Sequence, residues 1–158
     1  MPKYSIMFAS QTTATSTKSI LGCYMLTDST RQAEIVECIW TGSGSVAAAD
    51  IQHRGDLAGS TFAATGVSTS IVPIPWNPSA GAALGNFGAN YGTEPTATSA
   101  VHPVTVGFNQ RGGMRWAVPQ GEGFKIHNAG TTEKGAIMTT ISSAAGNVDG
   151  NLHLWQGN

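Results

Sequence analysis

Residues 104–118 alternate apolar and polar side chains in two short runs that are separated by a pair of glycines. Val104 to Phe108 form the first run and Met114 to Val118 the second, each with an apolar residue at every second position. This period of two is that of a strand with one buried face. Gly112-Gly113 can adopt positive φ without steric cost, and Pro119, which cannot donate to a sheet, ends the second run. We therefore predict a β-hairpin, with one apolar face and one polar face that carries Arg115.

Further short runs of this kind recur along the chain, bounded by Gly, Asn or paired Ser and Thr residues. The predicted strands span residues 3–8, 20–26, 33–41, 61–72, 123–127, 135–143 and 149–155. Together with the two runs above, their number and spacing are typical of two packed sheets. The sequence predicts an all-β fold: a single-domain antiparallel β-sandwich, jelly-roll-like, that spans residues 1–158 and has at most one short helix.

Three segments do not fit this pattern of strands. Residues 46–54 are the candidate helix, with Ser45 as its N-cap and Gly55 as its stop, although the segment can equally be extended. The polar stretch within residues 1–19 is a candidate N-terminal arm. Residues 73–98 begin with Pro73-Ile74-Pro75 and continue as a Gly/Ala-rich stretch, which we interpret as a long extended loop. Long loops in compact domains are usually functional.

The composition points to contacts with other proteins more than to nucleic acid or membrane. Charged residues make up 11% of the chain, less than half of the usual quarter, and 20 residues are Gly. A surface with so few charges is poorly protected against association, and either a partner-covered protein or a low-charge monomer fits it. The 8 Lys and Arg residues are scattered and the net charge is −1, which argues against nucleic acid.

No apolar run approaches membrane-spanning length, and the first residues do not have the organisation of a signal peptide. The sequence therefore predicts no membrane partner. We expect the protein to be made and used without secretion by that route.

The residue patterns of known catalytic and metal sites are missing from the sequence. Cys23 and Cys38 lie on predicted strands among apolar neighbours, and we expect two buried thiols there. The four histidines have no partner at a ligand or relay spacing: His53, His102, His127 and His153. There is no nucleophile elbow and no phosphate loop. We expect no enzyme, no metal and no cofactor, although strands far apart in the sequence can still assemble a site.

The aromatic residues divide into two groups. Those in predicted strands are expected in the core: Trp40, Trp116 and Trp155. Those in the long loop are expected at an interface or a sugar-stacking site: Trp76, Phe87 and Tyr91. Arg111, beside the predicted turn, is the charged residue best placed to reach a partner. The alternative is that Arg111 donates a hydrogen bond to a loop carbonyl of its own subunit.

A series of short motifs runs through the middle of the chain. They are Arg54, Gly59-Ser60-Thr61, Pro73-Ile74-Pro75, Glu94-Pro95-Thr96, Asn109-Gln110-Arg111 and Trp116. In this order they resemble small structural proteins that tailed bacteriophages encode near their head genes. The resemblance covers residues 49–119, which is less than half of the chain.

The resemblance implies a capsid decoration, or cement, protein: a non-enzymatic β-sandwich that binds over joints between major capsid subunits and stabilises the head. It implies two partners, the major capsid protein and further copies of the chain, as a homotrimer or a dimer. It also implies a place on the outside of the virion after synthesis in the host cytoplasm. The expected interface residues are Tyr4, Trp76, Phe87, Tyr91 and Arg111.

The alternative is a phage tail or head-fibre module with a carbohydrate- or receptor-binding face. That function requires Trp76, Phe87 and Tyr91 to be exposed around a concave surface. An enzyme, or an unrelated binding domain, requires a pocket with converging polar groups.

Overall fold

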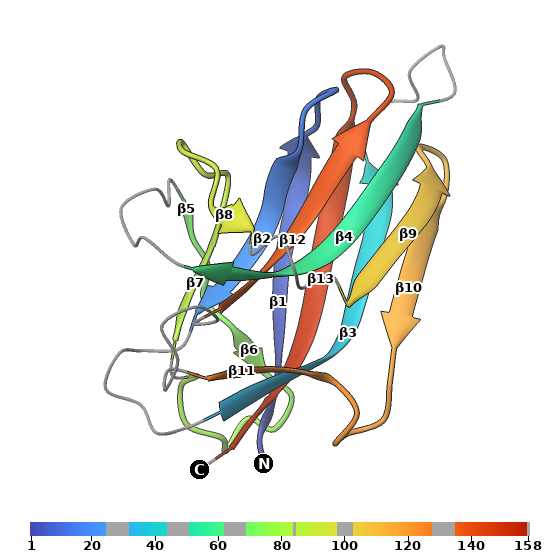
Figure 1. Cartoon of the computed structure of the whole chain (residues 1–158). Helices are drawn as coiled ribbons and strands as arrows, with labels where there is room; N and C mark the ends of the chain where they lie inside the picture. The colour runs from blue at the N-terminus through green and yellow to red at the C-terminus, as the bar shows by residue number, and fades with distance from the viewer. Residues whose placement is uncertain are drawn as a thin grey trace.

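The chain folds into two antiparallel sheets that pack face to face as a β-sandwich (Figure 1). This computed structural model describes residues 1–24, 32–43, 51–61, 69–83, 85–97, 103–127 and 135–157. Within these ranges every regular element is a strand and no helix occurs, so none could span a membrane. The all-β prediction is confirmed.

Sheet A and sheet B divide the strands between them. Sheet A contains β1 (Lys3–Thr12), β3 (Gln32–Ser43), β6 (Ile74–Pro75), β10 (Gly113–Ala117), β11 (Phe124–His127) and β13 (Asn147–Gln156). Sheet B contains β2 (Lys18–Tyr24), β4 (Gln52–Thr61), β5 (Thr69–Ser70), β7 (Asn86–Ala89), β8 (Thr96–Ala97), β9 (Val104–Asn109) and β12 (Gly135–Ser142). In Figure 1 sheet B lies nearer the viewer.

The order of the long strands is that of a jelly roll. Sheet A runs β10-β3-β13-β1-β6, and sheet B runs β5-β7-β2-β12-β4-β8, with β11 paired to β3 and β9 paired to β4. Along the eight strands β1, β2, β3, β4, β9, β10, β12 and β13 the chain changes sheet at every step except the one from β4 to β9. The result is β1-β13-β3-β10 packed on β2-β12-β4-β9, which is the eight-stranded jelly-roll arrangement.

The core lies between the sheets and is filled by the inward-facing residues of each strand. Trp40 of β3 is fully buried, and its indole lies against the backbone of β4 at Gly55, where a Cβ would come within 2.8 Å of the indole nitrogen. Cys23 and Cys38 face the core from opposite sheets as buried free thiols. Trp116 is only half-buried at the edge of the core, and Trp155 is half-buried outside it.

The predicted hairpin is wrong, although both of its strands form. β9 pairs with β4 in sheet B, whereas β10 pairs with β3 in sheet A, so the turn between them crosses the sandwich as an arch (Figure 1). Neither Gly112 nor Gly113 takes the positive φ of a tight hairpin turn. Gly113 instead allows close pairing, because a Cβ there would meet the Trp40 carbonyl oxygen at 2.6 Å.

Two further segments differ from their expected conformations. Residues 46–50 of the candidate helix lie outside the described residues, and its remaining part enters β4 as a strand. The candidate arm within residues 1–19 is built into the sandwich instead. β1 lies between β13 and β6 in sheet A, and β2 begins at Lys18 in sheet B.

The long loop of residues 73–98 contains three short strands, β6, β7 and β8, and folds back on the sandwich. Tyr91 lies over the outer face of sheet B, where it forms a small apolar cluster with Tyr24, Ala58 and Ile137. The Glu94 carboxylate accepts a hydrogen bond from the backbone N–H of Ser19 at 2.7 Å. The part of the loop that follows β7 therefore covers the outer face of sheet B.

Candidate functional site

The outer face of sheet A, which points away from sheet B, carries side chains in rows that cross the strands. Register pairing defines three rows, each written from β1 through β13 and β3 to β10 or β11. They are Lys3, Trp155, Glu34 and Lys125; then Ser5, His153, Glu37 and Ala117; then Met7, Asn151, Ile39 and Arg115. The first row lies toward the end of the sandwich that holds the chain termini, which we call the terminal end (Figure 1). The third row lies toward the opposite end of the sandwich. We call this the Arg111 end, because the arch between β9 and β10 there carries Arg111.

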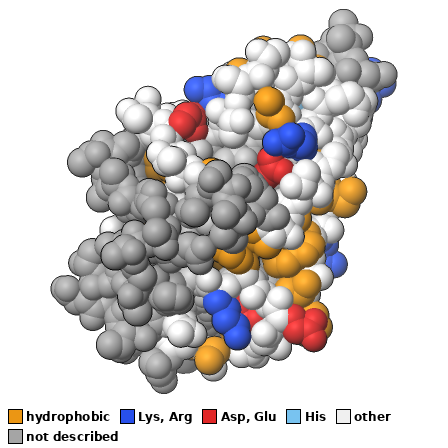
Figure 2. All heavy atoms as spheres, in the orientation of Figure 1, with side chains coloured by type: hydrophobic (Ala, Val, Ile, Leu, Met, Phe, Trp, Pro, Cys, Tyr) orange, Lys and Arg blue, Asp and Glu red, His pale blue; other side chains and the backbone are white. Residues whose placement is uncertain are grey.

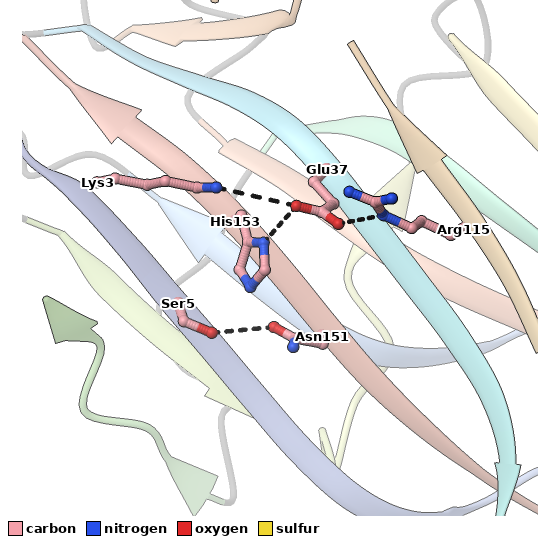
Figure 3. Close-up of polar contacts among 6 residues, drawn as sticks. All are labelled: Lys3, Ser5, Glu37, Arg115, Asn151 and His153. Carbon is pink, nitrogen blue, oxygen red and sulfur yellow. Dashed lines mark hydrogen bonds and ion pairs between the residues drawn. The ribbon is translucent and has the colours of Figure 1, made fainter. Parts of the chain in front are cut away.

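A buried carboxylate, Glu37, is the centre of this face (Figure 3). His153 Nδ1 donates to Glu37 Oε2 at 2.6 Å, and Arg115 Nε donates to Glu37 Oε1. The Lys3 ammonium lies 3.9 Å from Oε2. Four strands of sheet A are thus joined through one side chain.

The pKa of Glu37 follows from these contacts. Burial alone would raise it, but the hydrogen bonds from His153 and Arg115 outweigh burial, so that the pKa lies below its ordinary value of 4.5. Glu37 is therefore a carboxylate at neutral pH, and its negative charge holds the cations of this face in place.

Ser5, His153 and Glu37 have the residue types of a nucleophilic relay and occupy one row. The Ser5 hydroxyl, however, donates to Asn151 Oδ1 at 3.1 Å, and no bond joins it to the imidazole (Figure 3). Glu37 is also shared with two cations. A relay needs the hydroxyl within hydrogen-bond reach of the imidazole, so this geometry supports the structure of the sheet and does not activate Ser5.

The Arg111 end of the outer face of sheet A holds a shallow apolar hollow of about 440 Å³. Met7, Ala9 and Ile39 line it together with polar groups of Thr41 and Asp149. Met7 is 51% exposed. An apolar hollow with polar groups in its lining, on an open sheet face, is a candidate protein-binding surface.

Two more hollows lie at the terminal end of the same face. One, of about 500 Å³, is lined by Lys3, Trp76 and Trp155 among others. The second, of about 360 Å³, is lined by Glu34, Lys125 and again Trp155. Trp155 and Met1 belong to both, so the two hollows are neighbours.

A buried polar network occupies the Arg111 end between the sheets. Gln110 Nε2 donates to the backbone oxygens of Ser43 and Asn147, both at 2.9 Å, so its Oε1 must accept from His53 Nε2 at 2.6 Å. His53 Nδ1 then accepts from the Ser142 hydroxyl at 2.6 Å. Burial lowers the pKa of His53 below 6.5, and the bond to Gln110 offsets part of this. The imidazole is neutral and enclosed, so it joins the sheets and faces no ligand.

The five predicted interface residues are not brought together. Tyr4 is 2% exposed, Phe87 6% and Tyr91 7%, and all three are packed inside their own subunit. Trp76 is 59% exposed at the terminal end of sheet A. Arg111 is exposed at the opposite end, on the arch between β9 and β10. A concave surface shared by Trp76, Phe87 and Tyr91 therefore does not form.

Sequence reasoning missed the Glu37 cluster and the terminal hollows. Their members come from strands that are far apart in the chain, and only the register of β13 between β1 and β3 aligns them. The available signal was alternation: Lys3 and Ser5 on β1, and His153 and Trp155 on β13, occupy the polar phase of their strands.

Among the described residues, no group of three or more His, Cys, Asp or Glu side chains has the geometry to hold a metal ion. No family model matches the chain, and no curated protein or solved structure matches it either. A function for this chain therefore has to be inferred from its own residues and their geometry.

Proposed function

We propose that this protein is a non-enzymatic capsid decoration, or cement, protein of a tailed phage. It would attach to the major capsid protein through the Arg111 end of the outer face of sheet A. The observation that carries the proposal is the apolar hollow around Met7 and Ile39, which lies open beside the exposed side chain of Arg115. The motifs of residues 49–119 supply the phage context.

Two properties of the molecule support a binding role over a catalytic one. The titratable groups of the outer face, Glu37 and its partners, are bonded to one another and leave no activated nucleophile. On the described part of the face seen in Figure 2, charged side chains are few. Those at sheet B form opposite-charge pairs, Lys18 with Glu94 and Arg54 with Asp56. A low-charge surface favours close packing of many copies on a shell.

Attachment of many copies stabilises a shell by mass action, because a ligand that binds only the assembled state lowers its free energy in proportion to affinity and occupancy. A homotrimer, or a dimer, would present several copies of the Met7 hollow at once. Each contact can then be weak while the assembly binds tightly.

The test is cosedimentation of the purified protein with expanded and unexpanded shells that lack it, with the mass of the free protein measured in parallel. We expect saturable binding at a fixed ratio to the capsid subunit. Met7→Asp should weaken binding at least about tenfold, since an unpaired charge would be buried in an apolar contact. Val72→Asp, at an exposed residue outside this face, is the control. Absence of binding at micromolar protein would refute the proposal.

A further inference from the structure

We propose that the terminal end of the outer face of sheet A is a binding site for a short oligosaccharide of pyranose rings. The two terminal hollows are adjacent, since both contain Trp155 and Met1 in their walls. Together they form one trough, which we call the terminal trough. It lies at the opposite end of the face from the Met7 hollow and does not depend on the capsid proposal.

The floor of the terminal trough is one row of register partners. Lys3 pairs with Trp155, Trp155 with Glu34, and Glu34 with Lys125. Three strand spacings of roughly 4.8 Å give a floor about 14 Å long, which suits a short extended chain of sugar rings. The trough crosses the strands, so a ligand in it meets side chains and not the backbone of a sheet edge.

An exposed indole, Trp76, forms one wall and is held in place by the fold. Its backbone N–H donates to the Lys3 carbonyl oxygen at 2.9 Å. The Lys3 ammonium lies 3.9 Å from the centroid of the indole, and the His153 ring meets it edge-on at 5.2 Å. A large side chain that is fixed before binding loses little conformational entropy when a ligand stacks on it.

The polar groups of the terminal trough are also oriented in advance. Glu34 Oε1 accepts the backbone N–H groups of Gly121 and Gly123, at 2.7 and 2.6 Å. The amide side chains of Gln32 and Gln120 line the same hollow, and Asn77 lines the other. Amides, carboxylates and ammonium groups around the indoles provide donors and acceptors for ring hydroxyls.

The chemistry of the trough distinguishes a sugar from the other ligands. A pyranose ring has an apolar face, which packs on an indole, and a rim of hydroxyl groups, which needs several donors and acceptors. An extended peptide is usually recognised by main-chain pairing along a sheet edge, whereas this trough runs across the strands. A cationic ligand would be repelled by Lys3 and Lys125.

The experiment titrates the intact protein with maltohexaose, cellohexaose, chitohexaose and hexagalacturonate while its tryptophan fluorescence is recorded, and screens it in parallel on a printed glycan array. We expect at least one saccharide to bind with a Kd below millimolar and to change the emission. Trp76→Ala should weaken this binding about tenfold or more, as for the loss of an anchor residue. Gln120→Ala, at an exposed polar residue, should weaken it without unfolding the protein.

Met7→Asp is the matched control and should leave saccharide binding unchanged, while Trp76→Ala should leave capsid cosedimentation unchanged. This pair of variants separates failure of the trough from failure of the capsid proposal. No binding to any of the four saccharides or to the array at millimolar concentration would overturn the inference. Binding that survives both Trp76→Ala and Gln120→Ala would overturn it as well.

Discussion

Gly22 lies in the middle of β2, and its lack of a side chain leaves room for Tyr91 on the outer face of sheet B. The Tyr91 ring lies directly over it, and a Cβ at this position would overlap the Tyr91 hydroxyl oxygen and come within 2.9 Å of the Tyr24 ring. Tyr91 also donates to the Gly88 carbonyl oxygen at 3.2 Å, which fixes the ring. Gly22 therefore lets the segment after β7 close on the outer face of sheet B.

Gly22→Ala should lower the free energy of unfolding by about 1–3 kcal/mol, the usual cost of overfilling a packed site. Urea denaturation monitored by fluorescence measures this. Gly107→Ala is the control, because Gly107 is exposed in β9 and a Cβ there would meet nothing within 4 Å. Tyr91→Phe should recover part of the loss in the double variant, and equal losses at Gly22 and Gly107 would contradict the argument.

Glu37, on the outer face of sheet A, makes the stability of the folded protein depend on pH. Since its pKa is depressed in the folded state, its contribution to stability is present above 4.5 and is lost as the pH falls through the folded-state value. Glu37→Gln should cost about 1–3 kcal/mol at pH 7, because hydrogen bonds to a charged group are lost and three cationic or polar partners remain. The cost should shrink at pH 3.

Unfolding measured at pH 7, 5, 4 and 3 tests this. The matched control is Glu122→Gln, which removes the same charge from an exposed position. A variant at Glu37 whose deficit is constant over this range would contradict the assignment of a depressed pKa.

The arch between β9 and β10 links the two sheets at their Arg111 end. The Gln110 backbone N–H donates to the Ile51 carbonyl oxygen at the start of β4, and the Gly112 carbonyl oxygen accepts from Gly42 at the end of β3, each at 2.9 Å. The buried Gln110 side chain completes the link through His53. The arch is therefore part of the framework, and only its exposed tip, which includes Arg111, is open to a partner.

Gln110→Ala should destabilise the protein by about 2–3 kcal/mol, because it leaves buried His53 without its acceptor and removes two hydrogen bonds to backbone carbonyl oxygens. Circular dichroism during thermal unfolding measures the loss. Gln120→Ala, at an exposed glutamine, should have little effect. Similar melting temperatures for the two variants would show that the network contributes little.

The buried network of Gln110 and His53 should make the free energy of unfolding depend on pH, over a higher pH range than Glu37 does. His53 has a lowered pKa in the folded state, so both states are neutral above 6.5, and below it the unfolded chain binds a proton that the folded protein does not. The free energy of unfolding should therefore decrease as the pH falls from 6.5 toward 5. This slope should be absent in His53→Gln, and a slope that persists there would assign it to another group.

Among the strands, alternation in the sequence was sufficient to locate most of them but not to pair them. The pattern of residues 104–118 is the same for a hairpin and for an arch, because in both cases each strand has one apolar face. What separates them is Gln110, whose side chain is buried at the turn. Because polar residues are common at turns, the sequence does not indicate that Gln110 is buried.

Two of the three aromatic residues that were expected to be open on the long loop are buried, for a related reason. Phe87 and Tyr91 were expected at an interface because a loop has little use for large rings. In the folded chain Phe87 belongs to β7 and Tyr91 covers a sheet, so both serve the subunit itself. Loop residues that cover a sheet and loop residues that bind a partner have the same composition.

For the molecule as a whole, the reactivity of the two cysteines measures how well the core between the sheets is shielded from solvent. Burial raises the pKa of Cys23 to about 12 and raises that of Cys38, so neither thiol forms a thiolate at neutral pH. Both should resist Ellman's reagent in the native protein and react completely in guanidinium at a denaturing concentration. Rapid reaction of either thiol with the native protein would contradict the packing described for the core.

The position of β13 has a consequence for how the protein is made. This strand lies between β1 and β3, yet both of them leave the ribosome long before it does. Until it arrives, each presents an unpaired inner edge that other nascent chains can extend. Long-range pairing of this kind also folds slowly, on a scale of milliseconds to seconds. Synthesis of many copies at once would then carry a risk of aggregation that ends only when β13 inserts between β1 and β3.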